Sequence, residues 1–428
     1  MKASNRRFWL ALTLFSLMGQ VAWVVENMYF NVFIYKMFNA SAADISLMVG
    51  ASAVSAAITS VLMGAVSDRI GKRKLFICGG YIAWGLSIFG FVLLREDTLA
   101  ALFPAAASAA ALGVSLTVVL DCVMTFFGST ANDAAFNAWL TDSTTKENRG
   151  AAEGINAMMP LVAILAVFGG FMAFDLNEAS SWTAIFIIIG AATLLCGVAG
   201  LFILREPDIK PSSESVARNI TYGFLPSTMR GNAPLYTTLA LFVLFNISIQ
   251  IFMPYLILYY EVSLGMTDYV FVMAPAIILA SVVTALWGRV YDKRGFGYSV
   301  FFSLLWLCAG YVLLFFFKGK LLVFIGSLLM MCGYLAGMAV FGARIRDNTP
   351  TGKAGALQGV RIFSQVLIPG VVGPFIGKTV LKNAETVVNG DGTVSFVPNE
   401  GIFAAALGVA LVLSLLLIIT TKKTNKGA

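Results

Sequence analysis

The chain has 428 residues, of which 59% are hydrophobic and 12% are charged, and its mean hydropathy is +0.85. A soluble globular domain carries about 25% charged residues, so a water-soluble enzyme is excluded. The absence of histidine excludes histidine metal sites and proton relays, and the five cysteines show no CxxC spacing, so we expect no metal and no cofactor. The net charge is +7. In a chain this apolar we attribute it to the basic loops that orient a membrane protein, and not to nucleic-acid binding.

Apolar stretches long enough to cross a bilayer recur twelve times, and we number them spans 1 to 12. In the first half they cover 8–34, 45–66, 75–94, 110–140, 154–174 and 183–204. In the second half they cover 235–259, 269–288, 298–317, 321–342, 356–378 and 401–420. The region 100–140 is too long for one straight crossing, so a surface turn is expected there. Segment 381–400 contains Asn389-Gly390-Asp391-Gly392 and predicts a hairpin before span 12.

Lysine and arginine are distributed unevenly between the two ends of the spans. The two termini and the loops that follow even-numbered spans hold 22 of the 29. Cytoplasmic loops carry this excess, so both termini are expected in the cytoplasm of a multi-pass cell-membrane protein. The compact loops are typical of a bacterial inner membrane, and we expect a monomer. The polar linker 205–234 separates two six-helix bundles, 1–204 and 235–428.

Two motifs occur once in each half. Gly64-Ala-Val-Ser-Asp68-Arg69-Ile-Gly71 ends span 2, and Gly288-Arg-Val-Tyr-Asp292-Lys293-Arg-Gly295 ends span 8 with the same spacing. Asp142-Ser-Thr144 follows span 4, and Asp347-Asn-Thr349 follows span 10. Matching motifs at matching positions indicate duplication, which suits a protein whose halves rock around a central site.

With its basic tail Lys72-Arg73-Lys74, the first motif closely resembles the signature loop between helices 2 and 3 of the major facilitator superfamily. The resemblance implies an all-α integral membrane fold, with twelve transmembrane helices in two pseudo-symmetric bundles and alternating access. Such a protein is a transporter and not an enzyme.

Residues 132–142 in span 4 resemble the glycoside–pentoside–hexuronide cation symporters and their sucrose-type relatives. In those proteins an acid in the same register contributes to cation or sugar binding, a role that falls here on Asp133. Sodium-using members place acids in span 2, but Ser46 to Ser67 contains none. This departure favours the proton over sodium as the coupling ion.

Polar side chains within apolar spans are candidate site residues because they are costly in a bilayer. Amides and an indole suit a hydroxyl-rich ligand. The candidate substrate-binding residues are Gln20, Trp23, Glu26, Asn27 and Asn31 in span 1, Asn137 in span 4, Asn246 and Gln250 in span 7, and Gln358 and Gln365 in span 11. Gln20, Asn27 and Asn31 are expected on one narrow face of span 1. The alternative for all of them is hydrogen bonding that only holds the bundle together.

Proton coupling is assigned to four residues, Glu26, Asp121, Asp133 and Arg361. Twelve residues turn a helix by about 120°, so we expect at most one of Asp121 and Asp133 to be central, with Asp133 preferred. Arg361 requires a carboxylate partner, Glu26 or Asp133, unless it reaches the membrane interface.

Candidate gating residues lie at the cytoplasmic helix ends, where a carboxylate can meet a base on a neighbouring helix. They are Asp68, Arg69, Asp142, Asp292, Lys293 and Asp347. The alternative is that these loops only set orientation by their basic charge.

Taken together, the sequence favours a proton-coupled secondary transporter of a small polar solute, a sugar or glycoside. Its expected partners are this solute and the lipid bilayer, with no nucleic acid. An exporter of drugs or lipids on the same fold is the alternative, weakened because 154–175 lacks the glycine-proline signature of drug–proton antiporters. A membrane sensor or enzyme is a third interpretation, which no phosphate loop or nucleophile constellation supports.

Overall fold

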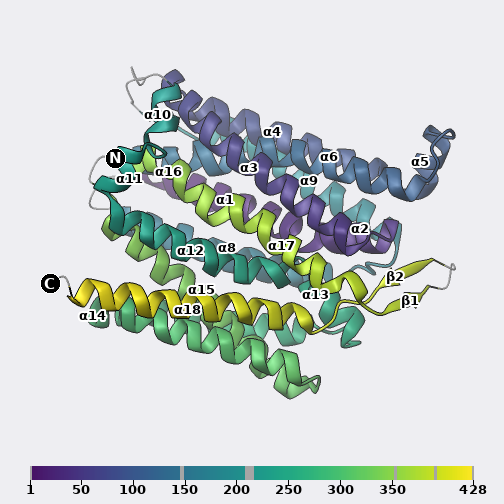
Figure 1. Cartoon of the computed structure of the whole chain (residues 1–428). Helices are drawn as coiled ribbons and strands as arrows, with labels where there is room; N and C mark the ends of the chain where they lie inside the picture. The colour runs from purple at the N-terminus through teal and green to yellow at the C-terminus, as the bar shows by residue number, and fades with distance from the viewer. Residues whose placement is uncertain (1, 145–148, 208–215, 351–353, 390–392, 427–428) are drawn as a thin grey trace. The chain divides into compact units, whose positions relative to one another are not determined.

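The computed structural model describes residues 2–144, 149–207, 216–350, 354–389 and 393–426, with the backbone alone at some helix ends beside the gaps. The chain divides into two compact units, Met1–Tyr222 and Gly223–Ala428. In Figure 1 the N-terminal unit runs from purple to teal and the C-terminal unit from teal to yellow. Both units consist almost entirely of helices.

Long apolar helices build the N-terminal unit. Span 1 comprises α1 (Lys2–Val24), the π-helical turn η1 (Val25–Tyr29) and α2 (Phe30–Phe38), followed by α3 (Ala42–Ile70) and α4 (Arg73–Gly90). The short helices η2 (Phe91–Leu93) and α5 (Glu96–Leu102) precede span 4, which confirms the expected surface turn. Span 4 comprises α6 (Ala109–Gly128), the π-helical segment η3 (Ser129–Phe136) and α7 (Asn137–Ser143), and the unit ends with α8 (Arg149–Phe171), α9 (Ala179–Ile203) and α10 (Val216–Tyr222).

The C-terminal unit contains the remaining helices and one small sheet. It begins with α11 (Pro226–Gly231), and span 7 comprises α12 (Ala233–Phe252), η4 (Met253–Tyr255), α13 (Leu256–Leu258) and η5 (Tyr259–Ser263). Next come α14 (Val270–Phe316), α15 (Lys320–Asn348), α16 (Ala354–Ile362), η6 (Phe363–Leu367), α17 (Ile368–Val380), η7 (Leu381–Asn383) and α18 (Gly401–Lys426).

The two-stranded sheet lies between η7 and α18. Strands β1 (Thr386–Val388) and β2 (Val394–Phe396) pair in antiparallel register, with Thr386 opposite Phe396. The expected hairpin is therefore confirmed, although its tip at 390–392 lies outside the described residues. In Figure 1 the hairpin and α11 lie at opposite ends of the C-terminal unit, as α5 and α10 do in the N-terminal unit.

The 47 residues of α14 form two segments that run in opposite directions. In one straight helix Trp287 and Trp306 would lie roughly 28 Å apart, but their ring centroids are 4.5 Å apart. The indole Nε1 of Trp287 also donates to the carbonyl of Ser299 at 3.2 Å. The chain turns at Gly295, whose φ of 75° favours glycine. These segments are spans 8 and 9.

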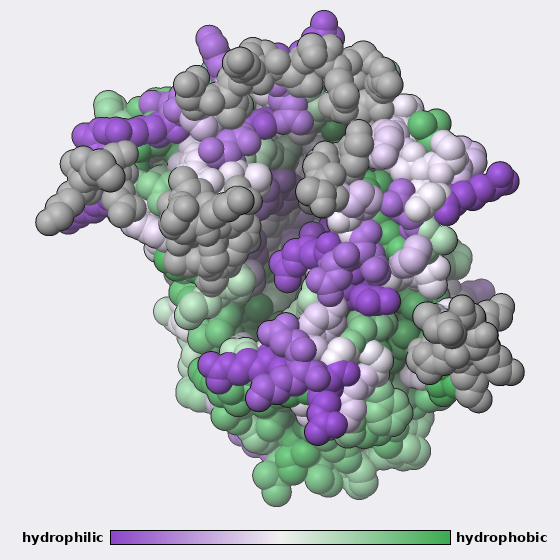
Figure 2. Space-filling model, turned by 90° about the vertical axis from the view of Figure 1, so that its left-hand side faces the viewer, coloured by the Kyte–Doolittle hydropathy of each residue, from purple (hydrophilic) through white to green (hydrophobic). Residues whose placement is uncertain are grey.

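Ten helical stretches of the described chain are long and apolar enough to cross a membrane. Counting α14 as two crossings and adding α8, whose apolar part is Ile155–Phe171, gives twelve within the described residues. Large apolar side chains such as Leu195 and Leu321 are exposed on the flanks, as lipid contact requires. Figure 2 views the helix ends near α10 and α11, where hydrophilic side chains gather. The protein is an all-α, multi-pass integral membrane protein.

Candidate functional site

Glu26 is the acidic residue of span 1 and is 7% exposed. Its Oε1 accepts hydrogen bonds from Ser52 Oγ at 2.7 Å and from Thr125 Oγ1 at 3.0 Å, and the two hydroxyls are 2.9 Å apart. Its Oε2 is buried and has no hydrogen-bond partner among the described residues. Glu26 lies in η1, and π-helical turns occur frequently at functional sites. Spans 1, 2 and 4 therefore meet at this carboxylate.

Asp121 is a second buried acid, 2% exposed, one turn before Thr125 on α6. Its carboxyl lies near both Glu26 and the Ser52 hydroxyl, which itself donates to Glu26. Its Oδ1 is buried without a hydrogen-bond partner in the described part of the chain. Ser52 thus lies near two carboxyl groups, each of which keeps one oxygen unsatisfied. The sequence did not identify Ser52 or Thr125, because hydroxyl residues in apolar helices commonly bond only to their own backbone.

Asp133 lies eight residues beyond Thr125, in the π-helical segment η3. Its Oδ2 accepts a hydrogen bond from Ser129 Oγ at 2.9 Å, and its charge also acts on Glu26. Asp133 as the central acid of the site stays a prediction, while Asp121 is the acid one helix turn before Thr125, which donates to Glu26. The expected angle assumed a continuous α-helix, which η3 interrupts.

A hydrogen-bond chain fixes the turn that carries Asp133. Asn132, 4% exposed, donates from Nδ2 to the Tyr81 hydroxyl at 2.7 Å. Tyr81 in turn donates to the carbonyl of Phe15 at 2.8 Å. A Cβ added at Gly19 would lie 2.0 Å from Asn132 Nδ2, so span 1 can approach this chain only with glycine there. These hydrogen bonds therefore connect spans 1, 3 and 4 next to Asp133.

The polar residues of span 1 do not share one environment. Asn31 is fully buried, whereas Asn27 is exposed, so the expected single face is wrong. The physical reason is η1, which lies between Gln20 and Asn31 and shifts the helical register. Asn31 donates to the carbonyl of Asn27 at 3.1 Å, and its buried Oδ1 has no partner among the described residues. Gln20 is half-buried.

Two indoles pack beside Glu26 in the same unit. The rings of Trp23 and Trp84 lie 5.0 Å apart between centroids, and both face Gly128 of span 4. The Nε1 atoms of both are buried, with no acceptor in the described part of the chain. The interior of this unit therefore holds unsatisfied donors as well as unsatisfied acceptors.

The other expected ligands lie in different surroundings. Asn137 is exposed and Asn246 is buried, and each donates to the carbonyl four residues earlier, at 3.1 and 2.8 Å. Gln250 and Gln365 are half-buried in spans 7 and 11. The side chain of Gln358 lies outside the described residues.

The interior of the C-terminal unit is aromatic. Tyr255, Tyr259, Tyr260 and Tyr311 are fully buried, and the Ser248 and Tyr311 hydroxyls are 3.0 Å apart. Among the described residues of this unit, no Asp or Glu side chain is buried as a whole, but the carboxylate oxygen Oε2 of Glu261, in η5, is a buried atom. Arg361 is half-buried in α16, and its expected pairing with an acid of the N-terminal unit stays a prediction.

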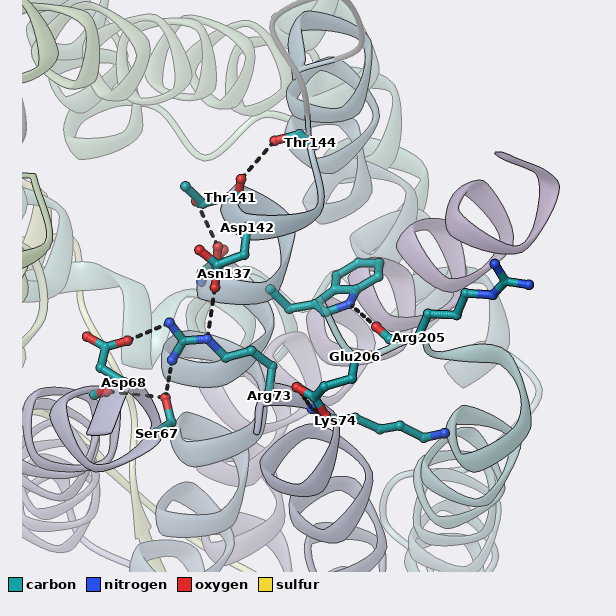
Figure 3. A network of polar contacts seen from close by, with 12 residues as sticks. Ser67, Asp68, Arg73, Lys74, Asn137, Thr141, Asp142, Thr144, Arg205 and Glu206 are labelled. Atoms are coloured by element: carbon teal, nitrogen blue, oxygen red, sulfur yellow. Dashed lines mark hydrogen bonds and ion pairs between the residues drawn. The ribbon is translucent and has the colours of Figure 1, made fainter. Parts of the chain in front are cut away.

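Arg73 joins three helix ends of the N-terminal unit (Figure 3). Its side chain is 7% exposed, and its guanidinium lies 2.5 Å from Asp68 Oδ1 and 3.0 Å from Asp142 Oδ2. It also donates to the Ser67 hydroxyl at 2.6 Å. The sequence identified both acids but assigned the base to Arg69, which is exposed. The signal for Arg73 was its position two residues after Gly71, where a φ of 71° turns the chain back toward α3.

The second copy of the motif is joined differently. The Tyr291 hydroxyl donates directly to Asp347, while Asp292 and Lys293 are exposed. The repeat offset places Tyr291 at the position of Ser67, and places Gly297 at the position of Arg73. The second half therefore keeps the acids of the motif without the arginine that pairs with them in the first half.

Comparison with solved structures finds transporters of the same architecture. The nucleoside transporter NupG superposes with a TM-score of 0.72 at 10% identity, covering 96% of this chain and 98% of that one. A bacterial homologue of the human lysosomal transporter Spinster, inward-facing and occupied, gives 0.69 at 17% identity and covers 99% and 98%. Identities this low show the fold alone.

A search of curated proteins finds no match. The family model of the Major Facilitator Superfamily matches residues 8–374, which is most of the chain. The match covers both motif copies and the buried acids of spans 1 and 4. The chain therefore belongs to the Major Facilitator Superfamily and is a membrane transporter.

Proposed function

We propose that this protein is a secondary active transporter that couples the movement of a small polar solute, a sugar or glycoside, to protons. The observation that carries the proposal is the pair of buried acids, Glu26 and Asp121, held around the Ser52 hydroxyl. Ionisable groups within membrane helices are costly, and they mark ion or substrate pathways.

Protonation of the pair explains the two unsatisfied oxygens. Two carboxylates this close repel each other in a medium of low dielectric constant. One proton removes a negative charge and converts one carboxyl oxygen into a donor for the other carboxylate. Glu26 Oε2 and Asp121 Oδ1 are the buried atoms without partners, so they are the candidates for this donor and acceptor. The lack of histidine leaves carboxyl groups as the natural proton carriers.

A polar, ring-shaped solute fits the remaining unsatisfied groups. The indole Nε1 atoms of Trp23 and Trp84 can donate, and Asn31 Oδ1 can accept. Indole faces also cover the apolar faces of a sugar ring. The resemblance of residues 132–142 to the glycoside–pentoside–hexuronide symporters supports the same class.

The helix-end network is proposed to act as a gate on the cytoplasmic side. The excess of basic residues at these ends supports a cytoplasmic location for both termini, in a bacterial inner membrane. Closing the Arg73 pairs with Asp68 and Asp142 ties spans 2, 3 and 4 together, and opening them frees these spans to move.

Counterflow in proteoliposomes tests the solute class, with a panel of sugars, glycosides and nucleosides. Uptake of the solute identified is then driven by an inward proton gradient or by a sodium gradient alone. We expect the proton gradient to drive accumulation and the sodium gradient to have no effect. Accumulation by sodium alone contradicts proton coupling, and efflux of drugs or lipids without sugar counterflow supports the exporter.

The coupling residues are tested in the same vesicles. Glu26→Gln and Asp121→Asn should retain counterflow, because exchange needs no net proton movement, but should lose accumulation above equilibrium. The matched control is Glu96→Gln, which removes an exposed acid at a loop helix. If the two variants accumulate solute as the wild type does, the acid pair does not couple transport.

A further inference from the structure

Basic side chains crowd the turn within α14 and the adjacent end of α15. They are Arg289, Lys293, Arg294, Arg344 and Arg346. Two acids accompany them, Asp292 and Asp347, and Asp347 accepts a hydrogen bond from Tyr291. Within the described residues, none of the five bases forms an ion pair with a carboxylate. The surface therefore carries positive charge that the protein itself does not neutralise.

The first copy of the motif shows the contrast. There, Arg73 is buried against Asp68 and Asp142, and the Lys74 Nζ donates to the carbonyl of Leu201 at 2.7 Å. The second copy has Gly297 and Tyr298 at these two positions. Its own bases, Arg289, Lys293 and Arg294, are exposed. The two bases that bond within the protein in the first half, Arg73 and Lys74, therefore have no counterparts in the second, whose bases face outward.

Two of these arginines rest on aromatic rings. The guanidinium of Arg294 lies 5.6 Å from the ring centroid of Tyr298, and that of Arg344 lies 5.5 Å from the ring of Phe296. The two rings lie on different faces of one helical segment, because Phe296 packs against the buried Phe341 at 5.5 Å, whereas Tyr298 is 44% exposed. A ring orients a guanidinium without neutralising its charge, so the N–H donors stay free to bind an anion. A guanidinium can bind phosphate oxygens through two parallel hydrogen bonds.

Aromatic side chains continue from the basic residues along both segments of α14. Trp287 packs against Trp306 and Phe302, at 4.5 and 6.3 Å between ring centroids, and Tyr298 lies 4.8 Å from Phe302. Tryptophan and tyrosine are enriched at the level of lipid headgroups. These rings therefore mark where this surface crosses from water into the bilayer.

Exposed apolar side chains follow on the membrane side of the aromatic group. Leu286, Phe301 and Leu305 are 54%, 59% and 49% exposed. The order along the two segments is thus basic, then aromatic, then aliphatic, which matches the phosphate, glycerol and acyl chains of a phospholipid. A free phosphate ion would use only the first of these three zones.

We propose that this surface, formed by both segments of α14 and the end of α15, binds an anionic phospholipid. Arg294 binds its phosphate, Arg344 adds positive charge at the end of α15, and its acyl chains lie along Leu286, Phe301 and Leu305. The inference does not depend on which solute is transported.

Quenching by brominated lipids tests the proposal, because bromine quenches nearby tryptophan fluorescence. The protein is reconstituted in phosphatidylcholine containing increasing fractions of dibrominated phosphatidylglycerol or dibrominated phosphatidylcholine. We expect phosphatidylglycerol to quench at the lower mole fraction. This preference should disappear in Trp287→Phe/Trp306→Phe, which removes the two indoles of the surface.

The basic residues are tested in the same assay. Each base near an anionic lipid surface contributes about fivefold in binding, so Arg294→Gln/Arg344→Gln should lower the preference by about 25-fold. Arg294→Lys/Arg344→Lys retains both positive charges and should keep most of the preference for phosphatidylglycerol. The matched control, Arg95→Gln/Lys318→Gln, removes two bases at loops before spans 4 and 10 and should leave it unchanged.

Three outcomes overturn the proposal. They are equal quenching by the two lipids, an unchanged preference in Arg294→Gln/Arg344→Gln, and displacement of the lipid by millimolar inorganic phosphate, which would indicate a free-anion site. If the glutamine variant does not fold, the quenching assay is repeated with the wild-type protein at high salt. Raising NaCl to about 0.5 M screens the charges and should erase the preference, and a preference that survives contradicts the proposal.

Discussion

The interiors of the two units differ in the groups that can change charge. The N-terminal unit buries Glu26 and Asp121 around shared hydroxyls, while among the described residues the C-terminal unit buries tyrosines and no whole acidic side chain. In the C-terminal unit, hydroxyl pairs such as Ser248 with Tyr311 satisfy each other. Among the described residues the pair of wholly buried acids is thus found in one half, while the other half carries a single acid with one buried oxygen, Glu261 in η5. Both halves therefore share the arrangement of helices, but they differ in the ionisable side chains that the helices bury.

The two halves also differ, to a smaller extent, in how the acids at their helix ends are paired. Both halves keep an acid after the even-numbered span, Asp142 in the first and Asp347 in the second. Arg73 bridges Asp142 to Asp68, whereas Tyr291 reaches Asp347 with a single hydroxyl. The first half therefore pairs two carboxylates with one buried cation, and the second half leaves Arg289, Lys293 and Arg294 exposed.

The largest effects are expected where the halves are alike, at glycines that let helix backbones touch. A Cβ at Gly85 would lie 2.5 Å from the Leu194 nitrogen, and one at Gly333 would lie 2.4 Å from the Leu307 nitrogen. Gly85→Ala and Gly333→Ala should each lower the free energy of unfolding by about 3 kcal/mol, because backbone atoms cannot move aside cheaply. Thermal unfolding in detergent measures the loss.

The controls for these glycines lie on the same two helices. Gly79 on α4 and Gly342 on α15 have no atom within 4 Å of an added Cβ. Alanine at either position should raise stability by about 0.5 kcal/mol, because glycine in a helix is entropically costly. If one half tolerated its close-contact substitution and the other did not, the two halves would not share this packing.

A smaller effect should separate the two helix-end networks. Arg73→Gln leaves Asp68 and Asp142 facing each other without a cation, and we expect a loss of about 2 kcal/mol, since both acids are partly exposed. Tyr291→Phe removes one hydrogen bond to a partly exposed carboxylate and should cost about 1 kcal/mol. Thermal unfolding of both variants shows which substitution lowers stability more. A larger loss for Tyr291→Phe than for Arg73→Gln would contradict this prediction.

Transport assays sharpen this prediction. Because the network is proposed as a gate, Arg73→Gln should lower the transport rate more than the solute affinity. Arg69→Gln is the matched control, since Arg69 is exposed in the same motif. A change in affinity with an unaltered rate would contradict a gating role for Arg73.

The fold was largely predictable from the sequence because long apolar stretches have few solutions in a bilayer. The turn before span 4 followed from the length of the region 100–140, and the hairpin before span 12 followed from its turn residues. The candidate site was predictable only in its acids, because buried carboxylates stand out in apolar spans. The hydroxyls of Ser52 and Thr125 carry no comparable signal.

Helical projection failed where the helices are not regular. The π-helical turns η1 and η3 carry Glu26 and Asp133, and each shifts the residues that follow it. Nothing in the local sequence marks these turns, so Asp121 could not be placed beside Glu26 by counting residues. The base that pairs with the acids of the motif is also set by a backbone turn. Gly71 turns the chain after α3, and Arg73 is the base that then meets Asp68.

The smallest effect is expected at two exposed ion pairs outside the membrane, one in each unit. Lys320 donates to Asp268 and holds the pKa of that carboxyl below its usual value, as Arg95, 3.2 Å away, does for Asp97. A lowered pKa stabilises the protein above the usual carboxyl pKa, and this contribution is lost as the pH falls through the lowered value. Asp268→Asn and Asp97→Asn should therefore lower Tm slightly at pH 7, and the difference from wild type should shrink as the pH falls below the usual carboxyl pKa of about 3.9. Thermal unfolding between pH 7 and pH 3 measures both. A difference that grew on acidification would have the wrong sign for an ion pair, and an effect in one unit alone would show that the halves also diverge at these ends.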